Sequence, residues 1–228
     1  MLFRSLKPGW ITQFSALVRQ EKLNIKFKIQ SRVDLLLQED NIKALAEAGC
    51  ETVWVGAESG SQKILDAMDK GTTVNQIYEA TRLLKKTGIR AAFFLQFGYP
   101  GETRSDIQHT IDMVLDLMPD DIGVSVSYPL PGTKFYDSVK NELVSKANWT
   151  DSDELALMFR NTYPSVFYKE LQRYLHRRFR SRQGLLLLKN ILKRPSLLSS
   201  DKLLQIGKAP FHFAGSFMHK ARMKQYEG

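Results

Sequence analysis

The sequence predicts an α/β fold with an incomplete (β/α) barrel of the TIM type, about four parallel strands, and a helical, basic C-terminal region. Apolar runs at residues 25–30, 52–55, 91–97 and 123–128 alternate with amphipathic segments of helical period. Short loops between such elements imply parallel pairing and right-handed crossovers. In addition, glycine-containing polar motifs follow two of these runs. Ligands of open α/β sheets and barrels bind at the carboxyl ends of strands, so a small-molecule site is expected there.

The four runs differ in ways that fit strands of one sheet. Residues 25–30 alternate apolar and polar side chains, whereas residues 91–97 are apolar nearly throughout. The second pattern is typical of a parallel strand that is covered on both faces. A closed barrel of eight units needs about 250 residues for the barrel alone, which excludes one here.

Helix signals separate the expected strands. Gly49 stands at the C-cap position of a helix over residues 38–48, Ser61 and Thr103 can cap two others, and Thr73 with Gln76 forms a capping box. A helix over residues 8–20 precedes the first strand, which hints that something upstream is missing. We divide the chain into a truncated partial barrel at 1–133 and a helical extension at 134–228. The helices expected in the extension cover residues 135–144, 153–160, 165–180 and 184–205, with a break at Pro195, and no pattern is clear from there to residue 228.

Composition describes an ordinary globular chain of 228 residues, 43% hydrophobic and 25% charged. One cysteine excludes an intramolecular disulfide and fits a reducing compartment. No apolar run is long enough for a membrane span and no secretory signal is evident, so a cytoplasmic location is expected.

The net charge of +9 is concentrated near the C-terminus, where residues 169–228 hold 14 Lys and Arg against 3 Asp and Glu. Such a tail can meet nucleic acid, anionic lipid or an acidic partner, or form a solvated helical face. Aromatic residues within and just before it could stack on bases, namely Phe167, Tyr168, Tyr174 and Phe179. Helical spacing explains them equally well as core, so nucleic acid is the less favoured partner.

Five short motifs occur in a fixed order along the chain. They are SRVD at 31–34, VGAESGS at 55–61, MDKG at 68–71, FGYPGET at 97–103 and YPLPGTKFY at 128–136. In order and spacing they resemble the radical S-adenosylmethionine (radical SAM) superfamily, in particular its cobalamin-dependent and anaerobic magnesium-protoporphyrin cyclase-like members. The resemblance covers about residues 8–180.

This resemblance implies a six-stranded partial barrel that holds a [4Fe–4S] cluster and S-adenosylmethionine at the strand ends. The family binds the cluster through a Cys-x3-Cys-x2-Cys motif after its first strand, and this chain has only Cys50. By the family pattern the first strand here is the family's third. The cluster loop and any upstream cobalamin domain are therefore expected to be absent.

Because a cubane cluster needs several thiolates, the chain alone is not expected to form the radical. The favoured reading is a fragment of a radical SAM enzyme of the methyltransferase or cyclase type, inactive alone. Two alternatives stay open, namely half of a two-chain enzyme, in which a separate chain supplies the cluster-binding part, and a non-catalytic domain that binds a nucleotide or a partner. Whether the chain is an enzyme, its catalytic residues and its substrate are not defined by the sequence.

The cofactor-side residues follow from the two strand-end motifs. Glu58 and Ser59 can hydrogen-bond ribose hydroxyls, and the family uses this position for the nucleoside or methionine end; helix capping is the alternative. Gly98, Tyr99 and Pro100 form a bend whose backbone can lie close to a flat adenine, or a plain strand-to-helix turn.

Three further residues complete the expected site. Gln96 and Ser127 could point into the barrel toward substrate, and Arg32 could pair with a carboxylate of the cofactor or with Glu58. No metal site is expected, since the histidines share no ligand spacing with a cysteine or with one another; they are His109, His176, His212 and His219.

Overall fold

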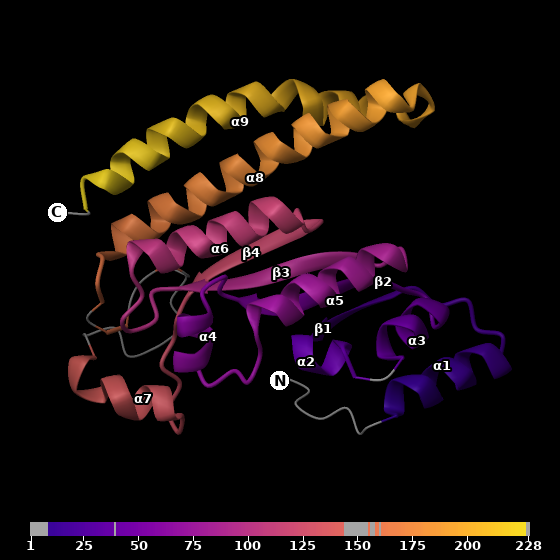
Figure 1. Cartoon of the computed structure of the whole chain (residues 1–228), viewed down its shortest axis with the longest axis horizontal. Helices are drawn as coiled ribbons and strands as arrows, with labels where there is room; N and C mark the ends of the chain where they lie inside the picture. The colour runs from indigo at the N-terminus through magenta and orange to yellow at the C-terminus, as the bar shows by residue number, and fades with distance from the viewer. Residues whose placement is uncertain (1–8, 39, 144–154, 156–157, 160, 227–228) are drawn as a thin grey trace. The chain divides into compact units, whose positions relative to one another are not determined.

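The computed structural model describes residues 9–38, 40–143, 155, 158–159 and 161–226. It confirms the predicted α/β class with a helical C-terminal region (Figure 1). The strands are β1 (Phe27–Ser31), β2 (Cys50–Glu58), β3 (Arg90–Phe97) and β4 (Asp121–Val126), and they form one sheet in the order β1-β2-β3-β4.

Parallel pairing of the strands is likewise confirmed. β2 pairs in parallel with both β1 and β3. Between β3 and β4, the N–H of Asp120 donates to the carbonyl of Ala91, and the N–H of Ser127 donates to the carbonyl of Phe97. These two bonds advance along both chains in the same direction, as parallel strands require.

Helices connect the strands as the cap signals predict. They are α1 (Trp10–Gln20), α2 (Val33–Leu36), α3 (Asn41–Glu47), α4 (Gln62–Ala67), α5 (Val74–Lys86) and α6 (Arg104–Leu117). The capping box of Thr73 and Gln76 is present, and a second box joins Thr103 to Asp106. Helix α2 was not predicted, because a single turn is too short to show a helical period.

Gly49 ends α3 in the left-handed conformation expected of it, with φ of +92°. A Cβ at this position would lie 2.2 Å from the backbone oxygen of Ile25. Only glycine therefore lets the chain turn from α3 into β2 so close to the segment that precedes β1.

Alternate residues of β2 have different surroundings. Val53, Val55 and Ala57 are fully buried, whereas Trp54, Gly56 and Glu58 are half-buried. The ring of Trp54 stacks on that of Phe94 in β3 at 4.6 Å between centroids. Glu58 is thus the last side chain on the more open of the two faces of β2.

The C-terminal region is more helical than predicted. It contains α7 (Lys134–Val139), α8 (Ser165–Lys193) and α9 (Ser200–Lys224), with single 3-10 turns at Lys140–Glu142 and Pro195–Leu197. The helix expected over 165–180 continues to Lys193, and the break expected at Pro195 falls between α8 and α9. The expected helix 153–160 lies largely outside the described residues; of those described, Leu155 is in a turn, Met158 is in a bend and Phe159 forms a bridge with Leu143.

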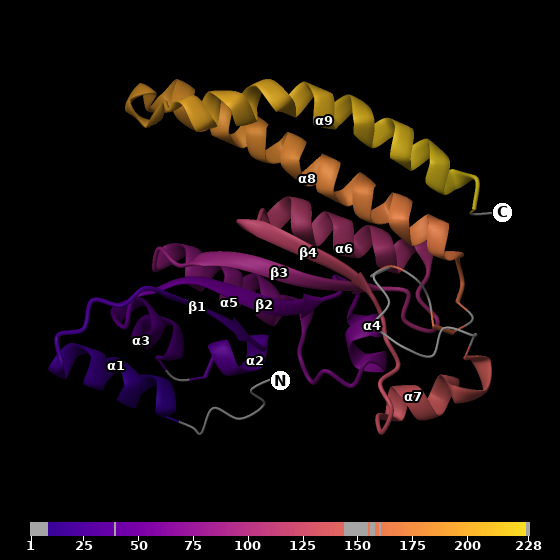
Figure 2. The ribbon, with the colours of Figure 1, turned by 180° about the vertical axis from the view of Figure 1, so that it is seen from behind.

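The chain forms two compact units. Unit 1 comprises residues 1–95 and 119–123, and unit 2 comprises residues 96–118 and 124–228. Within unit 2, α8 and α9 lie side by side in both views (Figures 1 and 2). No helix among the described residues is long and apolar enough to cross a membrane.

The aromatic residues of the basic region are part of the core. Phe167 and Phe179 are fully buried, and Tyr168 and Tyr174 are 1% and 7% exposed. Of the two explanations that the sequence left open for these rings, the structure supports the core and excludes stacking on bases.

Candidate functional site

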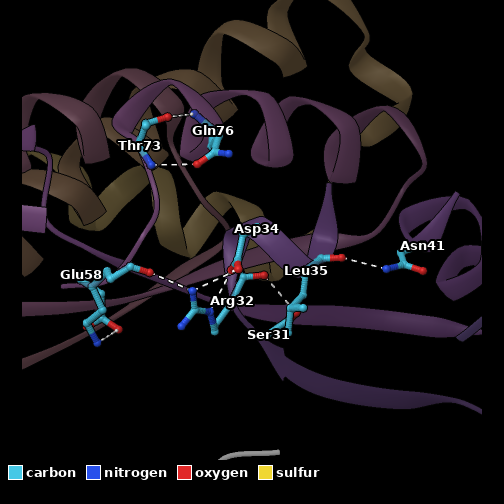
Figure 3. Close-up of polar contacts among 9 residues, drawn as sticks. Ser31, Arg32, Asp34, Leu35, Asn41, Glu58, Thr73 and Gln76 are labelled. Carbon is cyan, nitrogen blue, oxygen red and sulfur yellow. Dashed lines mark hydrogen bonds and ion pairs between the residues drawn. The ribbon is translucent and has the colours of Figure 1, made fainter. Parts of the chain in front are cut away.

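Four charged side chains meet after β1 and β2 in unit 1. The guanidinium of Arg32 donates to both carboxylate oxygens of Asp34 at 2.8 and 3.0 Å, and to the backbone oxygen of Lys70 at 2.8 Å. The ammonium of Lys70 lies 3.1 Å from Oε1 of Glu58. Figure 3 shows Arg32, Asp34 and Glu58 in this arrangement.

Glu58 combines two unusual features. It ends β2 with φ of +59°, in the left-handed region that non-glycine residues rarely adopt. Its Oε1 accepts from Lys70, whereas Oε2 is buried and has no hydrogen-bond partner among the described residues. Backbone strain and an unsatisfied buried acceptor both cost free energy, and such features gather at ligand sites.

Gly56 lets the Glu58 side chain lie flat on the strand. A Cβ at Gly56 would be 3.2 Å from Oε1 of Glu58. A larger side chain there would displace the carboxylate, so the position of Glu58 depends on this glycine.

Ser59 has a structural contact at the same strand end. It is fully buried, and its hydroxyl accepts a hydrogen bond of 3.1 Å from the N–H of Ser61, the N-cap residue of α4. This bond fixes the turn immediately after Glu58, whereas the helix cap that the sequence expected from Ser61 is not formed, because its side chain makes no cap hydrogen bond to α4.

Arg32 pairs with Asp34 instead of with Glu58. The hydrogen bond to Asp34 raises the pKa of Arg32, which stays charged in any case. Through its bond to the Lys70 carbonyl, Arg32 ties the turn after α4 to the end of β1. It therefore positions Lys70 beside Glu58.

The second group of predicted residues lies in unit 2, around Gly98. The N–H of Gly98 donates to Oε2 of Glu102 at 2.6 Å, and its carbonyl accepts from the amide of Asn161. With φ of +75°, a Cβ here would lie 2.9 Å from Nδ2 of Asn161 and 3.1 Å from the Tyr168 ring. The backbone of Gly98 thus packs closely against the ring of Tyr168 from the same chain.

Tyr168 is held by the same contacts. Its hydroxyl donates to Oδ1 of Asn161 at 3.1 Å. Burial, and then the charge of Glu102, raise the pKa of Tyr168 well above its usual range, so this phenol stays neutral.

The other predicted residues of unit 2 differ in burial. Tyr99 is half-buried with its ring 4.8 Å from that of Phe135, and Pro100 is exposed. Gln96 is half-buried, and Ser127 is buried with no hydrogen-bond partner for its hydroxyl among the described residues. An unsatisfied buried hydroxyl marks Ser127 as a second potential ligand contact.

The residues of this chain do not fit a [4Fe–4S] cluster. Cys50 is the single cysteine and begins β2, at the opposite end from Glu58. It is 7% exposed, and burial raises its pKa to about 11, so it is a protonated thiol at neutral pH. Among the described residues no three His, Cys, Asp or Glu side chains are grouped to hold a metal ion.

A nucleoside fits better than a metal. A ribose hydroxyl is a compact donor that would satisfy Oε2 of Glu58, as the sequence predicts for this position. S-adenosylmethionine carries two such hydroxyls on its ribose.

Sequence reasoning missed the partners of the predicted residues. Lys70, Asp34 and Glu102 stand inside the five motifs, so the motifs themselves could have directed attention to them. Asn161 and Tyr168 lie far along the chain from Gly98, and no local pattern links them to it.

Parts of the chain are similar to known proteins. The chain is 35% identical over 133 residues to an uncharacterised methyltransferase of Pyrococcus horikoshii, an alignment that covers 58% of this chain and 29% of the relative. It is 29% identical over 120 residues to the anaerobic magnesium-protoporphyrin IX monomethyl ester cyclase of Cereibacter sphaeroides, covering 52% of this chain and 20% of the cyclase. The chain thus spans less than a third of the length of these relatives.

A solved structure is similar as well. The radical S-adenosylmethionine methyltransferase TsrM of Kitasatospora setae, with cobalamin and a [4Fe–4S] cluster bound, aligns with a TM-score of 0.47 and 22% identity. The alignment covers 54% of this chain and 25% of TsrM. The family model described as the radical SAM superfamily matches residues 5–114. Over these residues, just under half of the chain, the sequence is similar to the radical SAM superfamily.

Proposed function

We propose that this chain is a fragment of a radical SAM enzyme of the methyltransferase or cyclase type, which binds the nucleoside part of S-adenosylmethionine and is inactive alone. The observation that carries the proposal is Glu58, whose strained backbone holds a buried, unsatisfied Oε2 at the carboxyl end of β2. In this superfamily the cofactor supplies the group-transfer chemistry, and the residues of this chain bind and orient it.

The residues of unit 1 have distinct parts in this binding. Oε2 of Glu58 accepts a hydrogen bond from a ribose hydroxyl, while Lys70 neutralises the carboxylate through Oε1. Arg32 positions Lys70, and Ser59 fixes the turn that follows Glu58.

The residues of unit 2 contribute a separate surface. The bend at Gly98, Tyr99 and Pro100 offers a half-buried aromatic ring for contact with adenine. Gln96 and Ser127 supply polar groups toward the cofactor or substrate. These contacts determine orientation and not the reaction itself.

Inactivity follows from the cysteine count. Three protein thiolates are needed to hold the cluster and leave one iron open for the cofactor, and this chain has one buried thiol. A separate chain or segment must therefore supply the cluster. The relatives, which are more than three times as long as the matched segment, have room for such a part.

A non-catalytic domain that keeps the fold to bind a nucleotide is the second candidate. The fully satisfied backbone of Gly98 favours it, because Glu102, Asn161 and Tyr168 already hold this bend in place. The two candidates share the Glu58 site and differ in whether a cluster-bearing partner restores turnover.

Anaerobic reconstitution with iron and sulfide tests the proposal. We expect no stoichiometric [4Fe–4S] absorption and no cleavage of S-adenosylmethionine by the chain alone. Formation of 5′-deoxyadenosine above a protein-free control would refute the proposal.

Binding of the cofactor is measured separately by ligand-observed NMR. Each net hydrogen bond contributes about 0.5–1.5 kcal/mol, so two or three contacts give about millimolar affinity. Glu58→Ala should abolish this binding, whereas Glu51→Ala, at the other end of the same strand, should leave it unchanged. Micromolar binding that survives Glu58→Ala would place the site elsewhere.

A further inference from the structure

Helix α9 has one face against α8 and one face open among the described residues. Its buried side chains are Ala209, Ser216, His219 and Met223, of which Ala209 lies next to Gly184 of α8 and His219 contacts Glu170 of α8. Large apolar side chains are exposed elsewhere on α9: Leu203, Leu204, Phe211, Phe213, Phe217 and Met218. Phe211 is 66% exposed and Leu204 is 58% exposed. So many exposed apolar residues on one helix indicate an interaction surface.

The exposed residues share one side of the helix. At 100° per residue, the six side chains fall within an arc of about 180° whose middle lies opposite the buried side of α9. Toward the edges of this arc, the rings of Phe211 and Phe213 also contact Arg177 and Arg178 of α8. Lys208 lies at one margin of this arc, and Lys202 and Lys220 lie at the other. We call this surface, made by the six apolar residues and the three lysines, the outer face of α9.

The last turns of α8, next to its connection with α9, also expose apolar side chains beside lysines. Leu185, Leu188 and Leu192 are exposed, Leu192 by 74%. Lys189 and Lys193 lie on the neighbouring strip of the helix. Both helices therefore combine exposed leucines or phenylalanines with adjacent cations.

The charge of the hairpin decides what can cover this face. Helices α8 and α9 and their connection, residues 165–224, carry 14 Lys and Arg, and their only acids are Glu170 and Asp201. Glu170 is buried and paired with His219 and Arg173, so it offers no negative charge at the surface. A second copy of the chain would bring a face of the same sign.

Nucleic acid explains the cations but leaves the apolar arc in water. A bilayer surface with anionic headgroups matches both features, because phosphates meet the lysines while apolar side chains enter the acyl boundary. Flanking lysines of this kind keep their ammonium groups at the headgroups while their stems lie along the apolar layer.

We propose that the outer face of α9, with the exposed leucines at the end of α8, lies in the interface of an anionic membrane. The association is peripheral, since none of the described helices can cross a bilayer. It brings unit 2 to the surface where an apolar substrate or partner would be found, and it is independent of cofactor binding at Glu58.

Vesicle co-sedimentation of the full chain tests the proposal. Vesicles of phosphatidylcholine with 30% phosphatidylglycerol should bind the chain at least tenfold more strongly than phosphatidylcholine alone, and added salt should weaken the binding. Phe211→Glu and Leu204→Glu should each reduce binding at least fivefold. Leu130→Glu, at an equally exposed leucine outside the hairpin, is the matched control and should have no effect.

A fluorescent probe gives a second readout. The chain's own Cys50 is buried, so Met218→Cys can be labelled selectively with an environment-sensitive dye. Its emission should shift to the blue on anionic vesicles. Circular dichroism of each variant checks that the helices remain folded.

Several results would overturn the proposal. One is the absence of vesicle binding, and another is binding that Phe211→Glu leaves unchanged. A dimer in solution that Phe211→Glu dissociates, without vesicle binding, would assign the face to a second copy. Binding to RNA that depends on Lys208 but not on Phe211 would assign the region to nucleic acid.

Discussion

At the scale of single residues, Glu58 combines two features that cost stability. A left-handed backbone at a non-glycine residue costs on the order of 1 kcal/mol or more, and its buried Oε2 is unsatisfied. Within the described part of unit 1, the ion pair with Lys70 engages Oε1 and leaves Oε2 unsatisfied. A ligand that donates a hydrogen bond to Oε2 would satisfy this oxygen and recover part of the cost.

Glu58→Asn should therefore stabilise the chain while it weakens nucleoside binding. Asparagine tolerates the left-handed region better and removes the buried charge, so we expect the free energy of unfolding to rise by about 0.5 kcal/mol. Urea unfolding measures it. Glu51→Asn, in ordinary strand geometry on the same β2, should instead lower stability, because asparagine is disfavoured in strands. A loss of stability in Glu58→Asn would show that the ion pair outweighs the strain.

Gly98 allows a direct comparison with a neighbouring glycine. Both Gly98 and Gly101 have positive φ, at +75° and +78°, but only at Gly98 would a Cβ meet Asn161 and Tyr168. Gly101→Ala should cost about 1 kcal/mol from backbone strain alone, and Gly98→Ala should cost about 3 kcal/mol or more because of the added overlap. Equal losses in thermal unfolding would contradict the close packing of Tyr168 on Gly98.

At the scale of elements, a buried charge network joins α8 to α9. Oε2 of Glu170 lies 2.6 Å from Nδ1 of His219, and Oε1 accepts from Arg173 at 2.6 Å. Burial alone would raise the pKa of Glu170, but the hydrogen bonds from His219 and Arg173 outweigh it, so the pKa lies below its ordinary value.

Glu170→Gln should destabilise the hairpin at neutral pH by about 2 kcal/mol, because it removes charged hydrogen bonds and leaves the buried His219 without its carboxylate partner. A carboxylate whose pKa is lowered on folding adds stability above its unfolded pKa, near 4.3, and loses it as the pH falls through the folded pKa. The difference between the two proteins should thus be constant above about pH 5 and shrink below pH 4. Asp201→Asn, at the exposed start of α9, is the control and should change little. Chemical unfolding at several pH values measures the difference, and a pH-independent gap would exclude ionised Glu170 as its source.

Elements were predictable where a local signal marks them. Cap residues such as Thr73 and Thr103 and the apolar strand runs depend on neighbours within a few residues, so the sequence locates α5, α6 and the strands closely. Helix α9 was predicted only as far as residue 205, and the rest was missed because Pro210 and two glycines interrupt its pattern and because many of its apolar residues are exposed. Sequence analysis looks for an apolar face that packs against the chain's own core. In α9 the large apolar residues lie on the open face, so their spacing does not give that pattern.

At the scale of the whole molecule, the places of the candidate residues at the strand ends were predictable from the sequence, but their contacts were not. The strand-end motifs place Glu58 and Gly98 correctly at the ends of β2 and β3. The sequence paired Arg32 with a carboxylate of the cofactor or with Glu58, whereas its partner in the structure is Asp34, two residues along the chain. Asn161 and Tyr168 reach Gly98 only through folding of unit 2, and no pattern in the sequence encodes that contact.

The single cysteine gives a final prediction about the whole chain, because it reports on opening of unit 1. A thiol with a pKa of about 11 is ionised to only about one part in a thousand at pH 8, and Cys50 is also buried. Alkylation by iodoacetamide in the native protein should therefore be slow, and it should rise with urea in parallel with unfolding followed by circular dichroism. The exposed thiol of Met218→Cys should react at once and serves as the internal control. Rapid alkylation of Cys50 in the native state would mean that it is an accessible thiolate, the state that a metal ligand requires, and would reopen the question of a cluster on this chain.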